Sequence, residues 1–221
     1  MDGYLDLADW RRRVAEIYAA WRHGAEADPE GATQRLRLAR DELFRSHPQS
    51  PLKPDQRARF GGLSYFPYDP VYRMVGKFAA ATTETEPARP DASAMPAFNV
   101  VQLPTSGSEP FSFRRIGTVS LSGPLAGSSL PVFWMEGYAG GLFPPFRDAT
   151  SGAETYGAGR YLLDTVKGAD MGGDWERGEL TLDFNLAYHP SCAYDPKWNC
   201  PLAPLESRLA PPVRAGERLP T

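Results

Sequence analysis

Frequent proline and glycine residues constrain the fold of this chain more than any other sequence feature. Its 221 residues include 22 prolines and 21 glycines. Because proline lacks a backbone N–H and glycine favours turns, such a chain is expected to form short strands rather than long helices. Hydrophobic residues make up 42% of the chain, which is enough for a core and excludes general disorder. One compact body with an appendage fits this length better than two large domains.

Only the first fifty residues carry a helical pattern. Apolar side chains recur every three or four residues from Leu7 to Trp21, the spacing that lines one face of an α-helix. Asp9 is expected to cap the start of this helix. A second pattern places Arg40 on its polar face and ends before His47-Pro48. We therefore expect residues 1–49 to form a helical arm that packs on its own domain or on a sister subunit.

From Phe60 onward, short runs of aromatic and β-branched residues are separated by turn residues, a pattern typical of strands. The expected strands are residues 72–78, 98–103, 111–121, 130–138, 155–163 and 179–187. The stretch 82–96 has no apolar period and is expected to be a loop. The regular spacing of the strands predicts a mainly β fold over residues 50–221, an antiparallel β barrel or sandwich behind the N-terminal α-helical arm.

Charge and hydropathy exclude several classes of function. A net charge of −3 gives no basic field for nucleic acid. No segment approaches the roughly 20 apolar residues of a membrane helix, and the first residues do not form a signal peptide. Two cysteines suit the reducing cytoplasm. We therefore expect a soluble, cytoplasmic protein without a nucleic-acid or membrane partner, and the absence of Walker and Rossmann motifs predicts no cofactor.

The last two expected strands carry polar side chains at alternate positions. Tyr156 and Arg160 share one face of the first strand, and Asp183 and Asn185 share one face of the second. Such a polar row cannot lie in a core without partners. If the two strands are antiparallel neighbours, Arg160 and Asp183 meet on one face. The pattern therefore predicts a charged cluster inside the β scaffold.

Three runs of residues resemble a known family. They are FRDATSGAETYGAGRYL (146–162), LDFNLAYHPSCAYDPKWNCPLAPLESRL (182–209) and AGE (215–217). Together they are similar to the prokaryotic family called domain of unknown function 1684 (DUF1684), and so many specific residues in order exceed chance. Weaker similarity in FGGLSYFPYDPVYRMVGKF (60–78) and GTVSLSG (117–123) extends the resemblance over roughly residues 50–217. The resemblance implies no particular reaction.

The resemblance does imply a set of signature positions. They are Asp148, Thr150, Gly152, Thr155, Tyr156, Gly159, Arg160, Asp183, Asn185, Tyr188, Pro190, Cys192, Cys200, Pro201 and Glu217. Two positions depart from the family, because His189 and Ser207 stand where asparagine is usual. Any role that requires His189 is therefore expected to be peculiar to this chain.

The leading hypothesis is that a pocket of the β-rich domain binds a small polar or anionic molecule. Arg160 would hold the ligand by a bidentate contact. Tyr156, Asn185, Tyr188 and Asp148 would supply further hydrogen bonds. Asp148 also suits a turn, where its carboxylate bonds nearby backbone N–H groups.

Two alternatives remain open. The first is an acid/base enzyme, a hydrolase or an isomerase, in which Glu154 or Asp183 is the base. The second is a structural or assembly module without a small-molecule site, in which the N-terminal arm mediates a homodimer.

The segment 189–200 gives a weaker hypothesis, that of a metal site. His189, Cys192 and Cys200 are residue types that bind zinc, but they supply only three ligands and match no common zinc-finger spacing. The other interpretations are a packed pair of thiols or a reversible disulfide.

Overall fold

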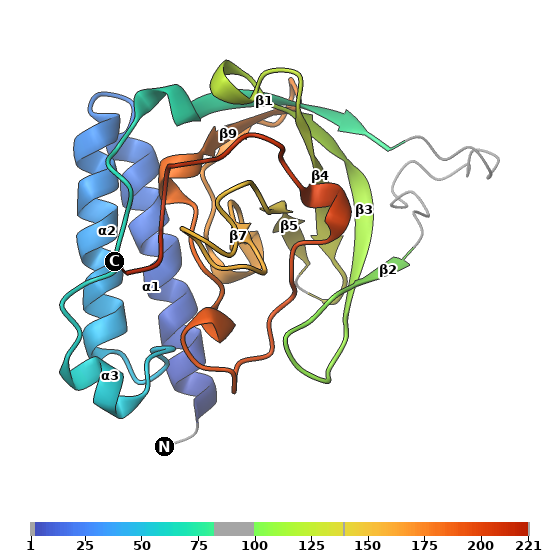
Figure 1. The fold of residues 1–221 in the computed structure, drawn as a ribbon. Helices are drawn as coiled ribbons and strands as arrows, with labels where there is room; N and C mark the ends of the chain where they lie inside the picture. The colour runs from blue at the N-terminus through green and yellow to red at the C-terminus, as the bar shows by residue number, and fades with distance from the viewer. Residues whose placement is uncertain (1–2, 82–99, 139, 221) are drawn as a thin grey trace.

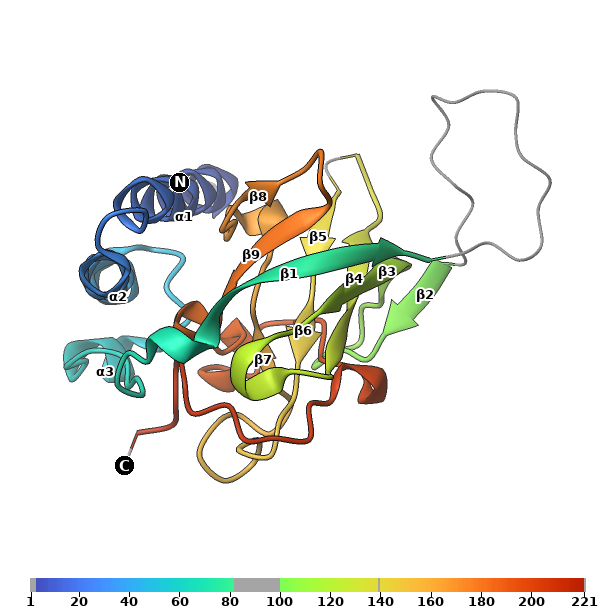
Figure 2. The same ribbon diagram turned by 90° about the horizontal axis from the view of Figure 1, so that it is seen from above.

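A computed structural model describes residues 3–81, 100–138 and 140–220 of the chain. It contains a helical pair followed by a mostly antiparallel sheet that curls into a half-barrel (Figures 1 and 2). This confirms the expected fold class. The expected loop 82–96 lies outside the described residues.

Among the described residues, two long helices lie within the expected arm 1–49, and one short helix follows it. They are α1 (Gly3–Gly24), α2 (Pro29–Ser46) and α3 (Pro54–Ala58). The second begins where the Asp28 carboxylate accepts a hydrogen bond from the Gly31 backbone N–H at 2.9 Å and proline occupies the first turn. It ends at His47, directly before Pro48, as the sequence predicts.

The expected role of Asp9 is wrong, because α1 starts earlier than the sequence pattern suggests. Asp9 lies inside the helix, where its carboxylate accepts hydrogen bonds from Arg12 and Arg13 at 2.7 Å each. It also lies 3.1 Å from the His47 imidazole at the end of α2. Asp9 therefore joins the two helices rather than capping one of them.

In the part of the chain that the structure describes, seven strands form the main sheet in the order β5-β4-β3-β1-β9-β8, with β2 pairing to β3. A separate two-stranded sheet pairs β6 with β7. The bounds are β1 (Arg73–Ala80), β2 (Val100–Leu103), β3 (Phe111–Ser120), β4 (Ser129–Met135), β5 (Gly141–Phe143), β6 (Pro145–Phe146), β7 (Arg160–Tyr161), β8 (Gly173–Asp174) and β9 (Glu179–Asp183). Short 3-10 turns connect them at η1 (Pro70–Tyr72), η2 (Gly123–Leu125), η3 (Thr165–Lys167), η4 (Phe184–Leu186), η5 (Ser191–Ala193) and η6 (Leu205–Ser207). These strands agree with the first four expected ones to within a few residues.

The last two expected strands are shorter than predicted and do not pair with each other. β7 bonds to β6, whereas β9 lies between β1 and β8. Gly159, with φ of +101°, turns the chain into β7, and a side chain there would meet the Phe146 carbonyl oxygen. At the end of β9, the Asp183 carboxylate accepts the Asn185 N–H and starts a 3-10 turn. The expected meeting of Arg160 and Asp183 is therefore wrong.

The helical arm and the sheet share one hydrophobic core. Tyr18 and Trp21 from α1 and Leu36 from α2 belong to the same buried cluster as Val119 and Leu182 of the sheet. The Trp21 indole N–H also donates to the Thr33 hydroxyl at 3.2 Å. Figure 2 shows α1 lying beside β8, with α2 next to α1 and farther from that strand. Within the described residues, no helix is long and apolar enough to cross a membrane.

The shared core makes a stability prediction. Replacing the 2%-exposed Trp21 by alanine should lower the free energy of unfolding by about 3–5 kcal/mol, because it removes a large buried side chain. The matched change Trp175→Ala, at a side chain that is 60% exposed, should have little effect. Urea unfolding followed by helical circular dichroism and by fluorescence should give coincident transitions for Trp21→Ala. Loss of the helical signal while the sheet stays folded would contradict a shared core.

Candidate functional site

Arg160, the expected ligand-binding cation, is buried inside the protein, where both terminal nitrogens of its guanidinium have partners and its Nε has none among the described residues. Its side chain is 1% exposed and donates to the Asp148 carboxylate at 2.8 Å. The same guanidinium donates to the backbone carbonyls of Val213, Ala215 and Glu217. Burial lowers the pKa of Arg160, and the Asp148 carboxylate opposes that shift. Arg160 therefore fixes the C-terminal segment against β7.

Asp148 completes this network as a turn residue. One carboxylate oxygen accepts the Thr150 N–H at 2.7 Å and the Val213 N–H at 3.2 Å, while the other binds Arg160. The side chain is completely buried. All of these contacts hold the segment around residue 213 to the turn at residues 148–155, so Asp148 and Arg160 together form a structural clamp.

The two carboxylates proposed as bases lie in separate surroundings. Glu154 is at the surface, where Arg214 forms a bidentate pair with it and lowers its pKa. Asp183 is completely buried and accepts both the backbone and the side-chain N–H of Asn185 at 2.9 Å. Burial raises the pKa of Asp183, and its nearest cation, Arg73, is 3.9 Å away. The structure does not bring these two groups to one site.

The Asn185 side chain hydrogen-bonds to the protein backbone and is not directed into a pocket. Its amide group exchanges two hydrogen bonds with the backbone of Asp69, at 2.8 and 3.0 Å. Arg37 of α2 donates to the Asn185 carbonyl at 3.1 Å. Asn185 thus ties β9 to the segment before β1 and to the helical arm.

His189 does not join the cysteines in a metal site. Its Nε2 accepts the Tyr156 backbone N–H at 3.2 Å, and its Nδ1 lies 3.5 Å from the Glu217 carboxylate. Burial lowers the pKa of His189, so the ring is neutral and carries its proton on Nδ1. Among residues 3–81, 100–138 and 140–220, no group of three His, Cys, Asp or Glu side chains could hold a metal ion. The zinc hypothesis is therefore not supported.

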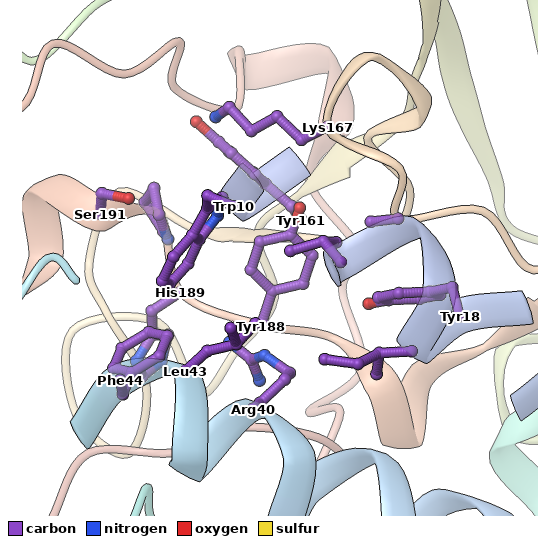
Figure 3. A pocket seen from close by; sticks show the side chains of 14 residues that line it. Trp10, Tyr18, Arg40, Leu43, Phe44, Tyr161, Lys167, Tyr188, His189 and Ser191 are labelled. Atoms are coloured by element: carbon purple, nitrogen blue, oxygen red, sulfur yellow. The ribbon is translucent and has the colours of Figure 1, made fainter. Parts of the chain in front are cut away.

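A cavity of about 60 Å³ lies between the helical arm and the segments around Tyr161 and Tyr188 (Figure 3). We call it the aromatic cavity. Its lining residues are Trp10, Val14, Ile17, Tyr18, Arg40, Leu43, Phe44, Tyr161, Lys167, Ala169, Tyr188, His189, Pro190 and Ser191. Of the expected ligand-binding residues, Tyr188 belongs to this lining. Side chains from α1, α2, β7 and the segments around Lys167 and His189 thus line one space.

The Tyr18 hydroxyl is the most unusual group in the aromatic cavity. It is buried, and it has no hydrogen-bond partner in the part of the chain that the structure describes. Figure 3 shows it directed toward the Tyr188 ring. Burial raises the pKa of Tyr18 to about 12, so the hydroxyl stays protonated. A buried hydroxyl without a partner costs about 1–3 kcal/mol, so this group needs an explanation.

Arg40 places a permanent positive charge in the wall of the aromatic cavity. It donates to the Tyr65 hydroxyl at 2.8 Å and to the Glu217 carboxylate at 3.1 Å, and it lies over the Tyr188 ring. Burial disfavours its charge, but Tyr65 and Glu217 raise its pKa above the ordinary value. The helical pattern put Arg40 on the polar face, which is wrong, since only 8% of it is exposed.

The sequence contains a partial signal for this cavity. Trp10, Val14, Ile17 and Tyr18 lie on one side of α1, a pattern that equally fits a helix packed on its own domain. Nothing local distinguishes Tyr18 from a core tyrosine, because its lack of a partner depends on residues far along the chain. The cavity was missed for that reason.

The clamp makes a second stability prediction. Arg160→Met should lower the free energy of unfolding by about 3–5 kcal/mol, because it leaves the buried Asp148 carboxylate without its cation. The control Arg214→Met removes an exposed ion pair with Glu154 and should leave the urea midpoint nearly unchanged. Equal effects of the two substitutions would show that Arg160 is not a structural clamp.

The comparisons with known proteins agree with this fold. The family model described as "Protein of unknown function (DUF1684)" matches residues 58–218. Among solved structures, the solution NMR structure of an uncharacterized protein from Haloarcula marismortui is 35% identical, with a TM-score of 0.57. The match covers 89% of this chain and 97% of that one. A comparison with curated proteins finds no match. On the family model and this structural likeness, the chain belongs to the DUF1684 family.

Proposed function

We propose that the protein binds a small molecule with a hydrogen-bond acceptor, such as a carboxylate or a carbonyl, in the aromatic cavity. The observation that carries this proposal is the buried Tyr18 hydroxyl, which faces the cavity without a partner among the described residues. A ligand acceptor at this point would receive the hydroxyl proton. Binding would thus remove the cost of burying an unpaired polar group.

The polar groups that line the aromatic cavity favour a ligand that accepts hydrogen bonds over one that donates them. Arg40, Lys167, Tyr18, Tyr188 and Ser191 all carry N–H or O–H groups. The acceptor nitrogen of His189 already receives the Tyr156 N–H. A ligand with a carboxylate or carbonyl therefore complements this wall, whereas an ammonium ligand would find few free acceptors and two like charges.

The rest of the lining is apolar and limits the ligand's size. Trp10, Leu43, Phe44 and Ile17 supply aliphatic and aromatic surface. A cavity of about 60 Å³ has room for more than one water molecule or a small organic group, but not for a nucleotide. Small apolar pockets with a few placed polar groups are typical ligand sites. The ligand class is therefore a small, partly apolar acid or carbonyl compound.

Ion pairs in the wall of the aromatic cavity limit how much negative charge a ligand can carry. Glu217 lies 3.1 Å from Arg40, and Asp164 lies 3.3 Å from Lys167, so each cation already has a carboxylate. A single negative charge on the ligand is favourable, whereas a multiply charged anion would lack enough unpaired positive charge. This argument favours monocarboxylates over phosphates.

A matched pair of tyrosine variants tests the proposal. Tyr18→Phe removes the hydroxyl and keeps the ring, so affinity for the best of formate, acetate and propionate should fall roughly five- to tenfold. The stability of the ligand-free protein should stay equal or rise, because the lost group has no partner among the described residues. Tyr4→Phe, on the same helix but 84% exposed, should change neither quantity. Thermal shift and titration calorimetry measure both.

Amines of matched shape supply the second control. Methylamine, ethylamine and propylamine offer donors in place of the acids' acceptors and should not raise the melting temperature. Equal shifts from acids and amines would refute the acceptor argument. An absence of any shift, together with native mass spectra free of a co-purified molecule, would refute the binding site itself.

A further inference from the structure

The two cysteines of the chain lie together under the C-terminal loop, outside the aromatic cavity. Cys192 is in η5, and Cys200 directly precedes Pro201. They are 8% and 3% exposed, respectively, and both are free thiols that hydrogen-bond to each other. The binding proposal uses neither of them, so this thiol pair needs its own explanation.

Two hydrogen bonds with Ser106 hold the backbone of Cys200 in place. Its N–H donates to the Ser106 hydroxyl at 2.9 Å, and its carbonyl accepts the Ser106 N–H at 3.0 Å. The next residues continue this contact through a bridge between Pro201 and Thr105. Cys200 is therefore fixed against the segment between β2 and β3, while Cys192 approaches from a 3-10 turn.

Cys192 has an unusual number of hydrogen-bonding groups for a buried thiol. The Tyr156 hydroxyl lies 3.8 Å from its sulfur, and hydrogen bonds from Cys200 and Ser106 also reach it. These contacts, the one from Cys200 first, lower the pKa of Cys192 to about 6 although burial opposes the shift. The same contact between the thiols raises the pKa of Cys200. These contacts therefore favour a thiolate on Cys192 over a thiolate on Cys200.

This asymmetry differs from ordinary packing of cysteines. A buried cysteine that only fills space behaves as a small hydrophobe and needs no donors around its sulfur. Redox-active cysteines instead combine a stabilised thiolate with a neighbouring cysteine that resolves the first oxidation product. Cys192 fits the first role and Cys200 the second.

We propose that Cys192 and Cys200 form a peroxide-reactive dithiol that closes to a disulfide. The Cys192 sulfur attacks one peroxide oxygen, the O–O bond breaks, and the departing oxygen takes a proton to leave as water or an alcohol. The resulting sulfenic acid on Cys192 is attacked by the Cys200 sulfur. An S–S bond forms, and the sulfenic oxygen leaves as water with the Cys200 proton. The two thiols lose two electrons, which reduce the hydroperoxide.

The burial of both sulfurs limits the size of the oxidant that can react with them. With exposures of 8% and 3%, neither residue offers enough surface to meet the thiol of another protein, so the oxidant must be a small molecule. The reaction is therefore expected with hydrogen peroxide or a short alkyl hydroperoxide, and not with a protein disulfide.

Oxidation of the reduced full-length chain by hydrogen peroxide tests this proposal without any variant. Intact mass should show the loss of two hydrogens, and peptide mapping should link Cys192 to Cys200. The initial rate should rise with an inflection near pH 6, where the thiolate of Cys192 forms. The same chain unfolded in urea should react about tenfold more slowly at neutral pH, because its thiols have ordinary pKa values. Equal rates for the folded and unfolded chains would overturn the proposal.

Three variants assign the roles. Cys200→Ser should accumulate a sulfenic acid on Cys192 that dimedone traps, whereas Cys192→Ser should give no dimedone adduct on Cys200. Tyr156→Phe keeps both thiols but removes one donor, and its rate inflection should move to higher pH. Thermal melts establish that each variant is folded. Trapping on Cys200 instead of Cys192, or an unmoved inflection in Tyr156→Phe, would contradict the assigned roles.

Discussion

A guanidinium group removed from water needs partners inside the protein, and this requirement organises the second half of the chain. The two terminal nitrogens of Arg160 bind one carboxylate and three backbone carbonyls, so a turn, a strand and the segment around residues 213–217 converge on a single side chain. Short strands and 3-10 turns supply little regular hydrogen bonding here. The buried cation compensates by fixing irregular backbone that no sheet ladder holds.

The convergence of these segments also creates the aromatic cavity. Once the C-terminal segment is in place, Glu217 accepts hydrogen bonds from the Arg40 guanidinium and from the His189 backbone N–H. These contacts join α2 to the loop that follows Tyr188. The helical arm can then cover the side of the half-barrel without closing the space between its aromatic residues. The network around Arg160 thus positions the C-terminal segment, and that segment in turn holds the residues around the aromatic cavity.

Sequence patterns within one segment predict the helices and strands that form from that segment's own residues. The periodic apolar residues of α1, the end of α2 before Pro48 and the alternating runs of β1, β3 and β4 all correspond to elements of the structure. The partners of β7 and β9 were not predictable in this way, because alternation gives a strand's faces but not its neighbour. The burial of Arg40 depends on Glu217, 177 positions away, and a helical pattern cannot contain that information. Asp183 and Asn185, which the sequence pattern singled out, bind each other, and Asn185 also binds the backbone of Asp69.

The position of the clamp's acceptors along the chain has a consequence for biosynthesis. Asp148 and Arg160 emerge from the ribosome well before Val213, Ala215 and Glu217, whose carbonyls complete the guanidinium's hydrogen bonds. Until those residues have been synthesised, the nascent chain carries a cation that cannot leave water, so its central region cannot consolidate. Folding of this half of the molecule is therefore a late event in translation, and the incomplete chain is the form that depends most on chaperones.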